Sequence, residues 1–171
     1  MARSKGSTPE KRLTHVNASG DAHMVGVSEK AVTRRRAVAS ARVTMRKQTL
    51  ALIVHGTSAK GDVLAAARIA GIQAAKRAWE LIPLCHQIAL TGADIEFVVE
   101  GDVARSSVLV TATVDAVDRT GVEMEALVAA STAALTVYDM LKAVDRWMTI
   151  TDLGLLEKSG GRSGTLKRGE P

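Results

Sequence analysis

Apolar and polar residues alternate along three stretches of the chain, and this pattern predicts β-strands. Over 37–45 every second residue is Ala, Val or Met, and the residues between them include Ser40 and Arg42. Two further runs alternate in the same way over 94–100 and 108–115. A period of two places the apolar residues on one face of a strand. Gly101-Asp102 is typical of a hairpin loop between these two runs, and a weaker strand is expected over 150–156.

Two longer apolar stretches have the composition of helices. The first follows Asp62, which can cap a helix N-terminus, and runs to about Leu81, because Pro83 cannot continue it. Its alanines and Gly71 predict close packing against another backbone. The second covers about 122–144 and contains thirteen consecutive uncharged residues, 126–138. A shorter helix is expected over 47–54.

The order of elements is strand, helices, strand, strand, helix, strand, which is typical of an α+β protein with a ferredoxin-like plait. We therefore expect an antiparallel four-stranded sheet with two long antiparallel helices on one face. Residues 21–158 form this single domain. Residues 1–20 are polar and basic and are interpreted as a flexible arm, and residues 159–171 as a glycine-rich basic tail.

The composition is that of one folded domain. The chain has 171 residues, 46% hydrophobic and 24% charged, which excludes general disorder. Cys85 is the only cysteine, so no disulfide can form within the chain, and a cytoplasmic location is expected. No uncharged run exceeds thirteen residues, which is too short to span a bilayer, and no apolar signal segment is present. We expect no membrane partner.

The net charge of +5 lies in the terminal segments. Residues 1–12 carry a net +3 and residues 157–171 a net +2, so residues 13–156 are balanced. The one dense basic run there, Arg34-Arg35-Arg36, is explained about as well by a solvated strand end. The four aromatic residues are also too few for a base-stacking platform. We therefore expect no nucleic-acid partner.

Charged residues occur at both ends of the second long helix. Glu123 and Glu125 open it, and Asp139 and Lys142 lie three apart near its end, on a shared face. Because the two long helices run antiparallel in this fold, Lys60 should approach Asp139 and Lys142. The segment Pro83-Leu84-Cys85-His86 should approach the other end. Fourteen residues separate Glu125 from Asp139, which is about 21 Å along a helix.

Neither end makes a convincing catalytic site alone, so we expect a composite site between chains of a symmetric oligomer. Each residue also has an ordinary structural explanation: helix ends reach solvent, His86 can be a satisfied loop histidine, and Cys85 can be packed. The cysteine and histidine spacing matches no metal site, and a Glu/His metal site is only weakly signalled. Lys158-Ser159-Gly160-Gly161 lacks P-loop spacing, although its backbone N–H groups could bind a phosphate.

Several blocks of sequence together resemble one family, the cyclic pyranopterin monophosphate synthases (MoaC family) of molybdenum cofactor biosynthesis. The resemblance runs from about residue 13 to 164. The blocks that carry it are Lys60-Gly61-Asp62, Ala70-Gly71-Ile72-Gln73-Ala74-Ala75-Lys76, Leu81-Ile82-Pro83-Leu84-Cys85-His86, Thr120-Gly121-Val122-Glu123-Met124-Glu125-Ala126-Leu127, Tyr138-Asp139-Met140 with Lys142-Ala143, and Lys158-Ser159-Gly160-Gly161.

The resemblance implies a reaction and an assembly. It implies a lyase that converts 3′,8-cyclo-7,8-dihydro-GTP into cyclic pyranopterin monophosphate and releases diphosphate. It implies a homohexamer, a trimer of dimers, with active sites at subunit interfaces. It implies no resident cofactor, although Mg²⁺ could accompany the triphosphate substrate.

The resemblance also implies roles for individual residues. Asp139 matches the family's catalytic acid/base, with Lys142 and Lys60 beside it. Substrate-binding residues are expected in two segments and at one lysine: Leu84, Cys85, His86, Glu123, Met124, Glu125 and Lys158. Protons must move in several steps while a purine-derived ring opens and closes, and positioned Asp, Lys, His and Glu can move them. Lysines and backbone N–H groups can stabilise the negative charge of the departing diphosphate.

The chain departs from the family pattern at three positions. Gly26 stands where the family usually has aspartate, and Arg119 and Arg162 stand where lysine is common. Gly26 is the best support for a second hypothesis, a non-catalytic oligomeric paralogue that binds a purine nucleotide or pterin. A third hypothesis, an RNA-binding plait, is disfavoured because the predicted strands offer Phe97 and little else for base stacking.

Overall fold

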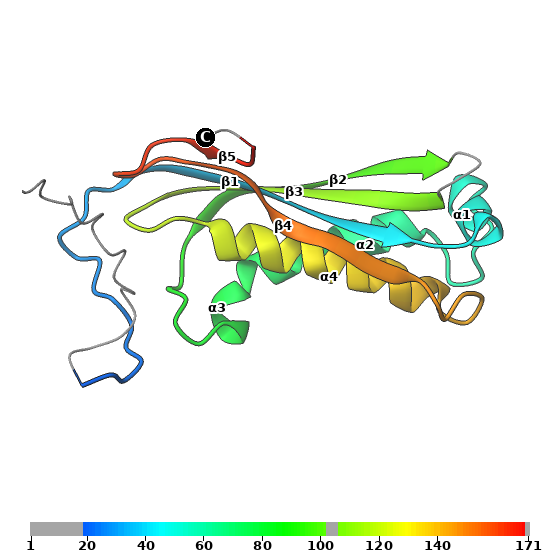
Figure 1. The fold of residues 1–171 in the computed structure, drawn as a ribbon, viewed down its shortest axis with the longest axis horizontal. Helices are drawn as coiled ribbons and strands as arrows, with labels where there is room; N and C mark the ends of the chain where they lie inside the picture. The colour runs from blue at the N-terminus through cyan, green and yellow to red at the C-terminus, as the bar shows by residue number, and fades with distance from the viewer. Residues whose placement is uncertain (1–18, 102–105, 170–171) are drawn as a thin grey trace, which may run out of the picture.

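The computed structural model describes residues 19–101 and 106–169 and has one sheet with helices on one face (Figure 1). The sheet order is β2-β3-β1-β4-β5, and every neighbouring pair is antiparallel. The described elements are β1 (Thr33–Thr44), α1 (Lys47–Val54), α2 (Val63–Lys76), α3 (Ala78–Leu81), β2 (Leu90–Gly101), β3 (Ser106–Asp118), α4 (Glu123–Leu141), β4 (Thr149–Ser159) and β5 (Leu166–Lys167). This confirms the α+β plait, with a fifth strand added at one edge.

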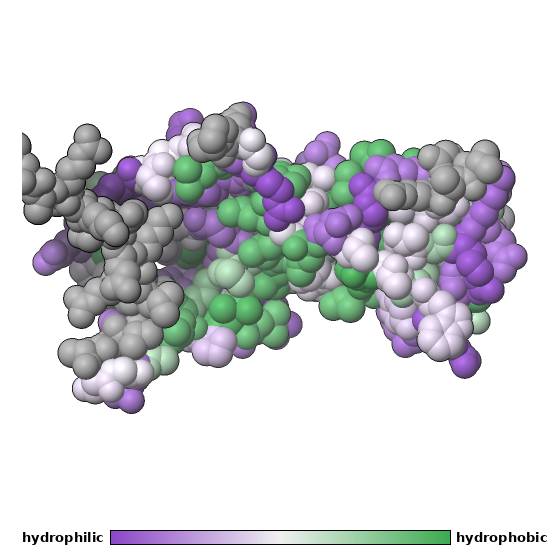
Figure 2. Space-filling model, in the orientation of Figure 1, coloured by the Kyte–Doolittle hydropathy of each residue, from purple (hydrophilic) through white to green (hydrophobic). Residues whose placement is uncertain are grey.

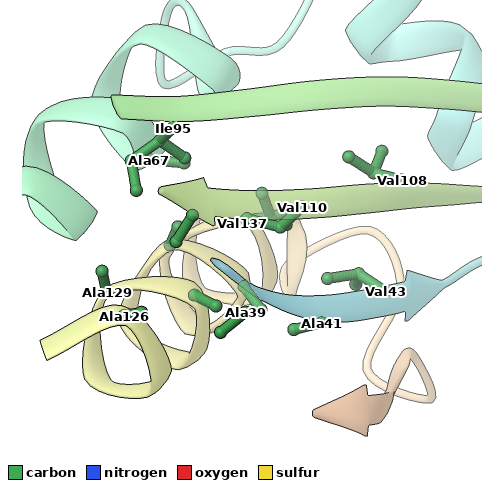
Figure 3. Close-up of a cluster of buried hydrophobic side chains, with 14 of the residues drawn as sticks. Ala39, Ala41, Val43, Ala67, Ile95, Val108, Val110, Ala126, Ala129 and Val137 are labelled. Carbon is green, nitrogen blue, oxygen red and sulfur yellow. The ribbon is translucent and has the colours of Figure 1, made fainter. Parts of the chain in front are cut away.

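The core lies between the sheet and α4, and small side chains allow a close approach. In β1, Ala37, Ala39 and Ala41 are fully buried and pair with residues of β3. Five alanines of α4 are also fully buried: Ala126, Ala129, Ala130, Ala133 and Ala134. Figure 3 shows Ala39 and Ala41 of β1 and Ala126 and Ala129 of α4 as members of one buried cluster. Alanine on both surfaces lets the helix lie close to the strands while the interior stays well packed.

The two long helices cross at Gly71, where the close packing predicted from sequence is confirmed. A Cβ atom at Gly71 would lie 3.0 Å from the backbone oxygen of Ala129 and 3.1 Å from Cδ1 of Ile95. Because backbone cannot move aside as a side-chain tip can, this position favours glycine. The predicted helix cap is also confirmed, since Asp62 Oδ1 accepts a hydrogen bond of 2.9 Å from the N–H of Ala65.

Several element boundaries differ from the sequence-based expectations, and the first three strands begin two to four residues earlier than expected. The helix expected to reach Leu81 ends at Lys76, and α3 follows after Arg77. The helix expected to reach residue 144 ends at Leu141. The last strand is longer than expected, Thr149–Ser159, and it contains register shifts against β1 and a positive φ of 53° at Asp152. Asp102 and the arm residues 1–18 lie outside the described residues.

The segment interpreted as a glycine-rich tail makes part of the sheet. Ser159 is the last residue of β4, and β5 pairs with β4 through Lys158↔Leu166 and Glu157↔Lys167. Two glycines at the turn, Gly160 and Gly161, have φ values of 95° and 71°, which favour glycine. The chain therefore folds back on itself beside Lys158.

Helix α4 is long and apolar enough to cross a membrane by length and composition alone, but half of its apolar window is buried inside the fold. Its buried residues pack against the sheet and against α2, as in a core helix. In the space-filling view, apolar residues gather over the middle of the molecule, and hydrophilic residues cover the end where α1 lies (Figure 2).

Candidate active site

Two clusters of polar side chains lie at opposite ends of α4. We call the first the acid–lysine cluster; it comprises Lys60, Asp139 and Lys142. Lys142 Nζ lies 2.6 Å from Asp139 Oδ1, and Lys60 Nζ lies 3.5 Å from Oδ2. Lys60 Nζ also donates a hydrogen bond of 2.9 Å to the backbone oxygen of Asp139. The approach of Lys60 to the end of α4 was predicted from the antiparallel helices and is confirmed.

The two lysines set the charge state of Asp139. The hydrogen bond from Lys142, its positive charge and then that of Lys60 hold the pKa of Asp139 below its usual value. The Asp139 carboxylate in turn raises the pKa of Lys142. All three side chains are about half exposed. The cluster therefore offers one carboxylate that can accept a proton and ammonium groups that can donate one, open to an incoming molecule.

We call the second group the thiol–histidine cluster; it comprises Leu84, Cys85, His86 and 123–125. Cys85 Sγ donates to Glu125 Oε1 at 3.4 Å, and His86 Nε2 lies 3.0 Å from the backbone oxygen of Val25. A carbonyl oxygen only accepts, so Nε2 carries the hydrogen. In the neutral ring this leaves Nδ1 as the basic nitrogen. The expected approach of this loop to the start of α4 is confirmed.

Burial controls the chemistry of the thiol–histidine cluster. Glu125 is 3% exposed, and its Oε2 is buried without a hydrogen-bond partner among the described residues. Burial therefore raises the pKa of the Glu125 carboxyl, although the Cys85 hydrogen bond partly opposes it. Burial and the nearby Glu125 raise the pKa of Cys85 to about 12. At neutral pH Cys85 is thus a packed thiol and not a nucleophilic thiolate.

Two adjoining cavities open beside the thiol–histidine cluster. The smaller, about 230 Å³, is lined by residues that include Leu84, Cys85, His86 and Met124. The larger, about 610 Å³, shares Lys30, Thr120, Gly121 and Glu123 with it. We call the larger one the basic cavity, because its wall includes Lys30, Arg35, Arg36, Arg119, Lys158 and Arg162. Lys158 therefore lies at the thiol end of the protomer.

Arg35 joins the two walls of the basic cavity. Its Nε donates to the backbone oxygen of Asp118 at 3.1 Å, and its Nη2 donates to that of Arg119 at 2.9 Å. On the other side, a Cβ atom at Gly161 would overlap the Arg35 guanidinium. Arg35 and Arg36 therefore line a cavity, and Arg34 and Arg36 are also exposed at the start of β1, as expected for a solvated strand end. The sequence did contain a signal for this cavity, namely two basic segments, one at the end of a strand and one rich in glycine.

The structure brings the predicted site residues together in two groups and not in one. Lys60, Asp139 and Lys142 form one group, and the substrate-binding candidates, with Lys158, form the other. Fourteen residues of α4 separate Glu125 from Asp139, which is about 21 Å. Figure 1 shows α1 at the acid–lysine end of α4 and α3 at the thiol end. Among the described residues, no three His, Cys, Asp or Glu side chains gather as a metal site.

The position of Gly26 is open. A Cβ atom there would meet no atom within 4 Å among the described residues, and its φ lies outside the positive range. An aspartate could therefore occupy this position without a clash. The difference from the expected family pattern is one of chemistry and not of space.

A family model described as the MoaC family matches residues 24–161, so this chain belongs to the MoaC family. The match includes both clusters and most of the basic cavity. The chain is also 58% identical over 156 residues to proteins of Mycobacterium bovis and Mycobacterium tuberculosis that are named "Cyclic pyranopterin monophosphate synthase 3". The aligned region covers 91% of this chain and 86% of each relative.

Proposed function

We propose that this protein is a lyase of molybdenum cofactor biosynthesis, a cyclic pyranopterin monophosphate synthase. It converts 3′,8-cyclo-7,8-dihydro-GTP into cyclic pyranopterin monophosphate and diphosphate. Membership of the MoaC family and the relatives of that name support the reaction. One observation carries the proposal. An exposed acid–lysine cluster lies at one end of α4, and the basic cavity lies at the other end.

The proposed roles follow from the chemistry of each group. Asp139 acts as acid/base, and Lys142 and Lys60 supply protons and positive charge beside it. The thiol–histidine cluster binds the ring system of the substrate; its members for this role are Leu84, Cys85, His86, Glu123, Met124 and Glu125. Lys158 and the other bases of the basic cavity bind the triphosphate, where charge-assisted hydrogen bonds favour phosphate oxygens. Stabilising negative charge there favours departure of diphosphate.

The active site is composite: the acid–lysine cluster of one protomer works with the thiol–histidine cluster of another. The separation of about 21 Å along α4 supports this arrangement, since a substrate of nucleotide size cannot span it and react at both ends. We propose a homohexamer built as a trimer of dimers, in the cytoplasm, without nucleic-acid or membrane partners. We propose no resident cofactor; any Mg²⁺ enters with the triphosphate, so EDTA should lower turnover only through substrate binding.

The first experiment separates the enzyme from the non-catalytic paralogue. Purified protein is given the cyclised GTP intermediate, and diphosphate and pterin product are followed. Turnover with equimolar release of both products is expected. Tight substrate binding without turnover would contradict catalysis and support the binding paralogue. Gly26→Asp is the informative variant, because the position has room for the side chain. A paralogue inactive for want of this carboxylate would gain turnover in the Gly26→Asp variant.

Complementation tests the composite site. Asp139→Ala and His86→Ala proteins, each inactive alone, are unfolded together and reassembled, and subunit exchange is verified by mass. About one quarter of wild-type activity is expected in a one-to-one mixture, because random pairing leaves that fraction of two-chain sites intact. A mixture that exchanges subunits but stays inactive would rule out sites shared in this way. The double variant Asp139→Ala/His86→Ala mixed with wild type is the control for exchange itself.

A further inference from the structure

A buried aspartate that the proposed mechanism does not use lies just beyond α4. Asp145 is 1% exposed, in the segment that joins α4 to β4. Its Oδ2 accepts hydrogen bonds from the N–H of Arg46 at 2.9 Å and from the hydroxyl of Thr49 at 3.1 Å. Its Oδ1 accepts from the N–H of Trp147 at 3.3 Å and lies 3.2 Å from Arg46 Nε. Burying a charge is costly unless it is paired and hydrogen-bonded, as this one is.

These contacts join Asp145 to the start of another element. Helix α1 begins after Arg46, whose own side chain makes no cap hydrogen bond. Asp145, about a hundred residues away, accepts hydrogen bonds from the N–H of the N-cap residue Arg46 and from the hydroxyl of the buried Thr49 in the first turn of the helix. Arg46 also donates to the backbone oxygen of Val144, and the hydroxyl of Tyr138 donates to that of Arg146 at 3.2 Å. The segment after α4 is thus fastened to α1 and to α4.

The two elements that Asp145 joins carry the acid–lysine cluster. Asp139 and Lys142 lie three to six residues before Asp145, at the end of α4. Lys60 lies six residues after α1. The connection from α1 to Lys60 is short and hydrogen-bonded, through Thr57 N–H to Leu52 O at 3.0 Å and Gly61 N–H to Ser58 O at 3.0 Å. Lys60 thus lies in the connection between α1 and α2, three residues before α2 begins at Val63, so the positions of both helices set where Lys60 meets Asp139.

We propose that Asp145 is a positioning residue for the acid–lysine cluster. It holds α1, and with it the connection that leads to Lys60, against the end of α4. The role as it bears on turnover rests on the proposed function; the placement of Lys60 beside Asp139 does not. Among the described residues, the hydrogen bonds and the ion pair of the Asp145 side chain involve Arg46, Thr49 and Trp147 and no residue of the thiol–histidine cluster or the basic cavity. Its loss should therefore damage one half of the composite site and leave the other half intact.

The test uses Asp145→Asn, which keeps the size of the side chain but replaces one acceptor oxygen by a donor. At a temperature where the variant is folded, kcat should fall about 10- to 100-fold, as expected for a displacement of about 1 Å in a catalytic group. KM should change less than about threefold, because the binding residues lie at the other end of α4. The control is Ile95→Val, a substitution of a buried residue of β2 that packs at Gly71 and makes no contact with Asp145 among the hydrogen bonds and ion pairs above. It should lower the melting temperature and leave kcat at the wild-type value.

The activity of mixed assemblies distinguishes a positioning role from general destabilisation of the fold. Asp145→Asn subunits should restore activity when mixed with His86→Ala subunits, which contribute an intact acid–lysine cluster. The same subunits should not restore activity with Asp139→Ala subunits, because both then lack that cluster. Restoration with Asp139→Ala, or equal changes in kcat and KM, would overturn the proposal.

A substrate-free measurement keeps this inference separate from the proposed reaction. The carboxyl pKa of Asp139, followed by NMR in assembled protein, should rise in Asp145→Asn as Lys60 moves away, and should not rise in Ile95→Val. If wild-type protein shows no turnover, this measurement still decides the positioning role. If Asp145→Asn does not fold, Thr49→Val removes a single hydrogen bond with little change in shape. An unchanged Asp139 pKa and kcat in folded Thr49→Val would then overturn the proposal.

Discussion

The two ends of α4 each present a carboxyl group, and their surroundings shift the two pKa values in opposite directions. At one end, Lys142 and Lys60 lower the pKa of the exposed Asp139. At the other end, burial raises the pKa of Glu125, which receives a hydrogen bond from the thiol of Cys85. Basic residues are present at this end too, but they line the basic cavity, whereas the Glu125 side chain is buried.

The difference comes from residues that other elements supply. Lys60 arrives from the segment before α2, and Cys85 from the segment after α3. A composite site that combines the two ends holds one ionised carboxylate among ammonium groups and one carboxyl group that retains its proton to higher pH. Two carboxyl groups with separated pKa values suit a reaction that needs both a proton acceptor and a proton donor.

Asp139→Ala should give the largest effect. We expect kcat to fall by about 10²- to 10⁴-fold, the contribution typical of a general acid or base. Assembly should be unaffected, because the side chain of Asp139 is 59% exposed. Steady-state kinetics and size-exclusion chromatography measure the two outcomes. Asp94→Ala, an exposed aspartate on β2, is the matched control and should leave both unchanged. Wild-type rates in Asp139→Ala would remove Asp139 from the mechanism.

Gly161→Ala tests whether the thiol end binds the anionic part of the substrate. The added methyl would overlap Arg35 and disturb the wall of the basic cavity. We expect KM to rise about tenfold, equivalent to one weakened charge-assisted hydrogen bond, with a smaller change in kcat. Gly164→Ala is a matched control, since Gly164 also has a positive φ, 61°, but no atom within 4 Å of an added Cβ. Equal KM values for the two variants would contradict a role for the wall beside Arg35.

Glu125→Gln sharpens the contrast in pKa. A carboxyl group whose pKa is raised by folding stabilises the protein at low pH, and this contribution is lost as the pH rises through the pKa of the folded state. The neutral amide has no such dependence, so the melting temperature of the variant relative to wild type should rise between pH 5 and pH 8. At this chain length, each kcal/mol of free energy of unfolding corresponds to about 2–4 °C in melting temperature. Glu96→Gln, an exposed substitution, should show no such trend. If the melting temperature of the variant relative to wild type instead falls between pH 5 and pH 8, the pKa of Glu125 is not raised by folding.

Lys142→Met should give the smallest effect on the unliganded protein. Removing the hydrogen bond and charge of Lys142 should let the pKa of Asp139 rise toward its usual value, with no measurable change in melting temperature. Carboxyl NMR titration of unliganded protein measures it. Lys76→Met, an exposed lysine at the end of α2, should leave the Asp139 pKa where it is in the wild type. An unmoved pKa in Lys142→Met would show that Lys60 alone determines it.

Much of the fold could be predicted because it depends on local patterns. Alternation placed the alanines of β1 on the buried face, Asp62 marked the start of α2, and Gly71 marked the helix crossing. The break after Lys76 and the strand β5 were missed. The first depends on how α3 packs, and the second on pairing of a two-residue segment with β4, so neither has a periodic signal of its own.

The two groups of site residues could be predicted from helix direction, since antiparallel helices bring the start of one beside the end of the other. The basic cavity could not. Its wall combines a strand end, a turn and a glycine-rich segment that are far apart in the sequence. Arg35 and Arg119, for example, are more than eighty residues apart. The distribution of charge along the sequence does not indicate which basic residues line the same cavity.

The amino-acid sequence by itself determined the order and type of the elements and the types of chemical group available, because periodicity, caps and side-chain identity are local properties. Only the tertiary structure decided which groups meet and in which protonation state. The pKa of Asp139 depends first on Lys142, three residues away, and then on Lys60, 79 residues away, and that of Glu125 depends on burial by the whole fold. Distance in space and exposure to water govern electrostatic energies, and both arise only when the chain has folded.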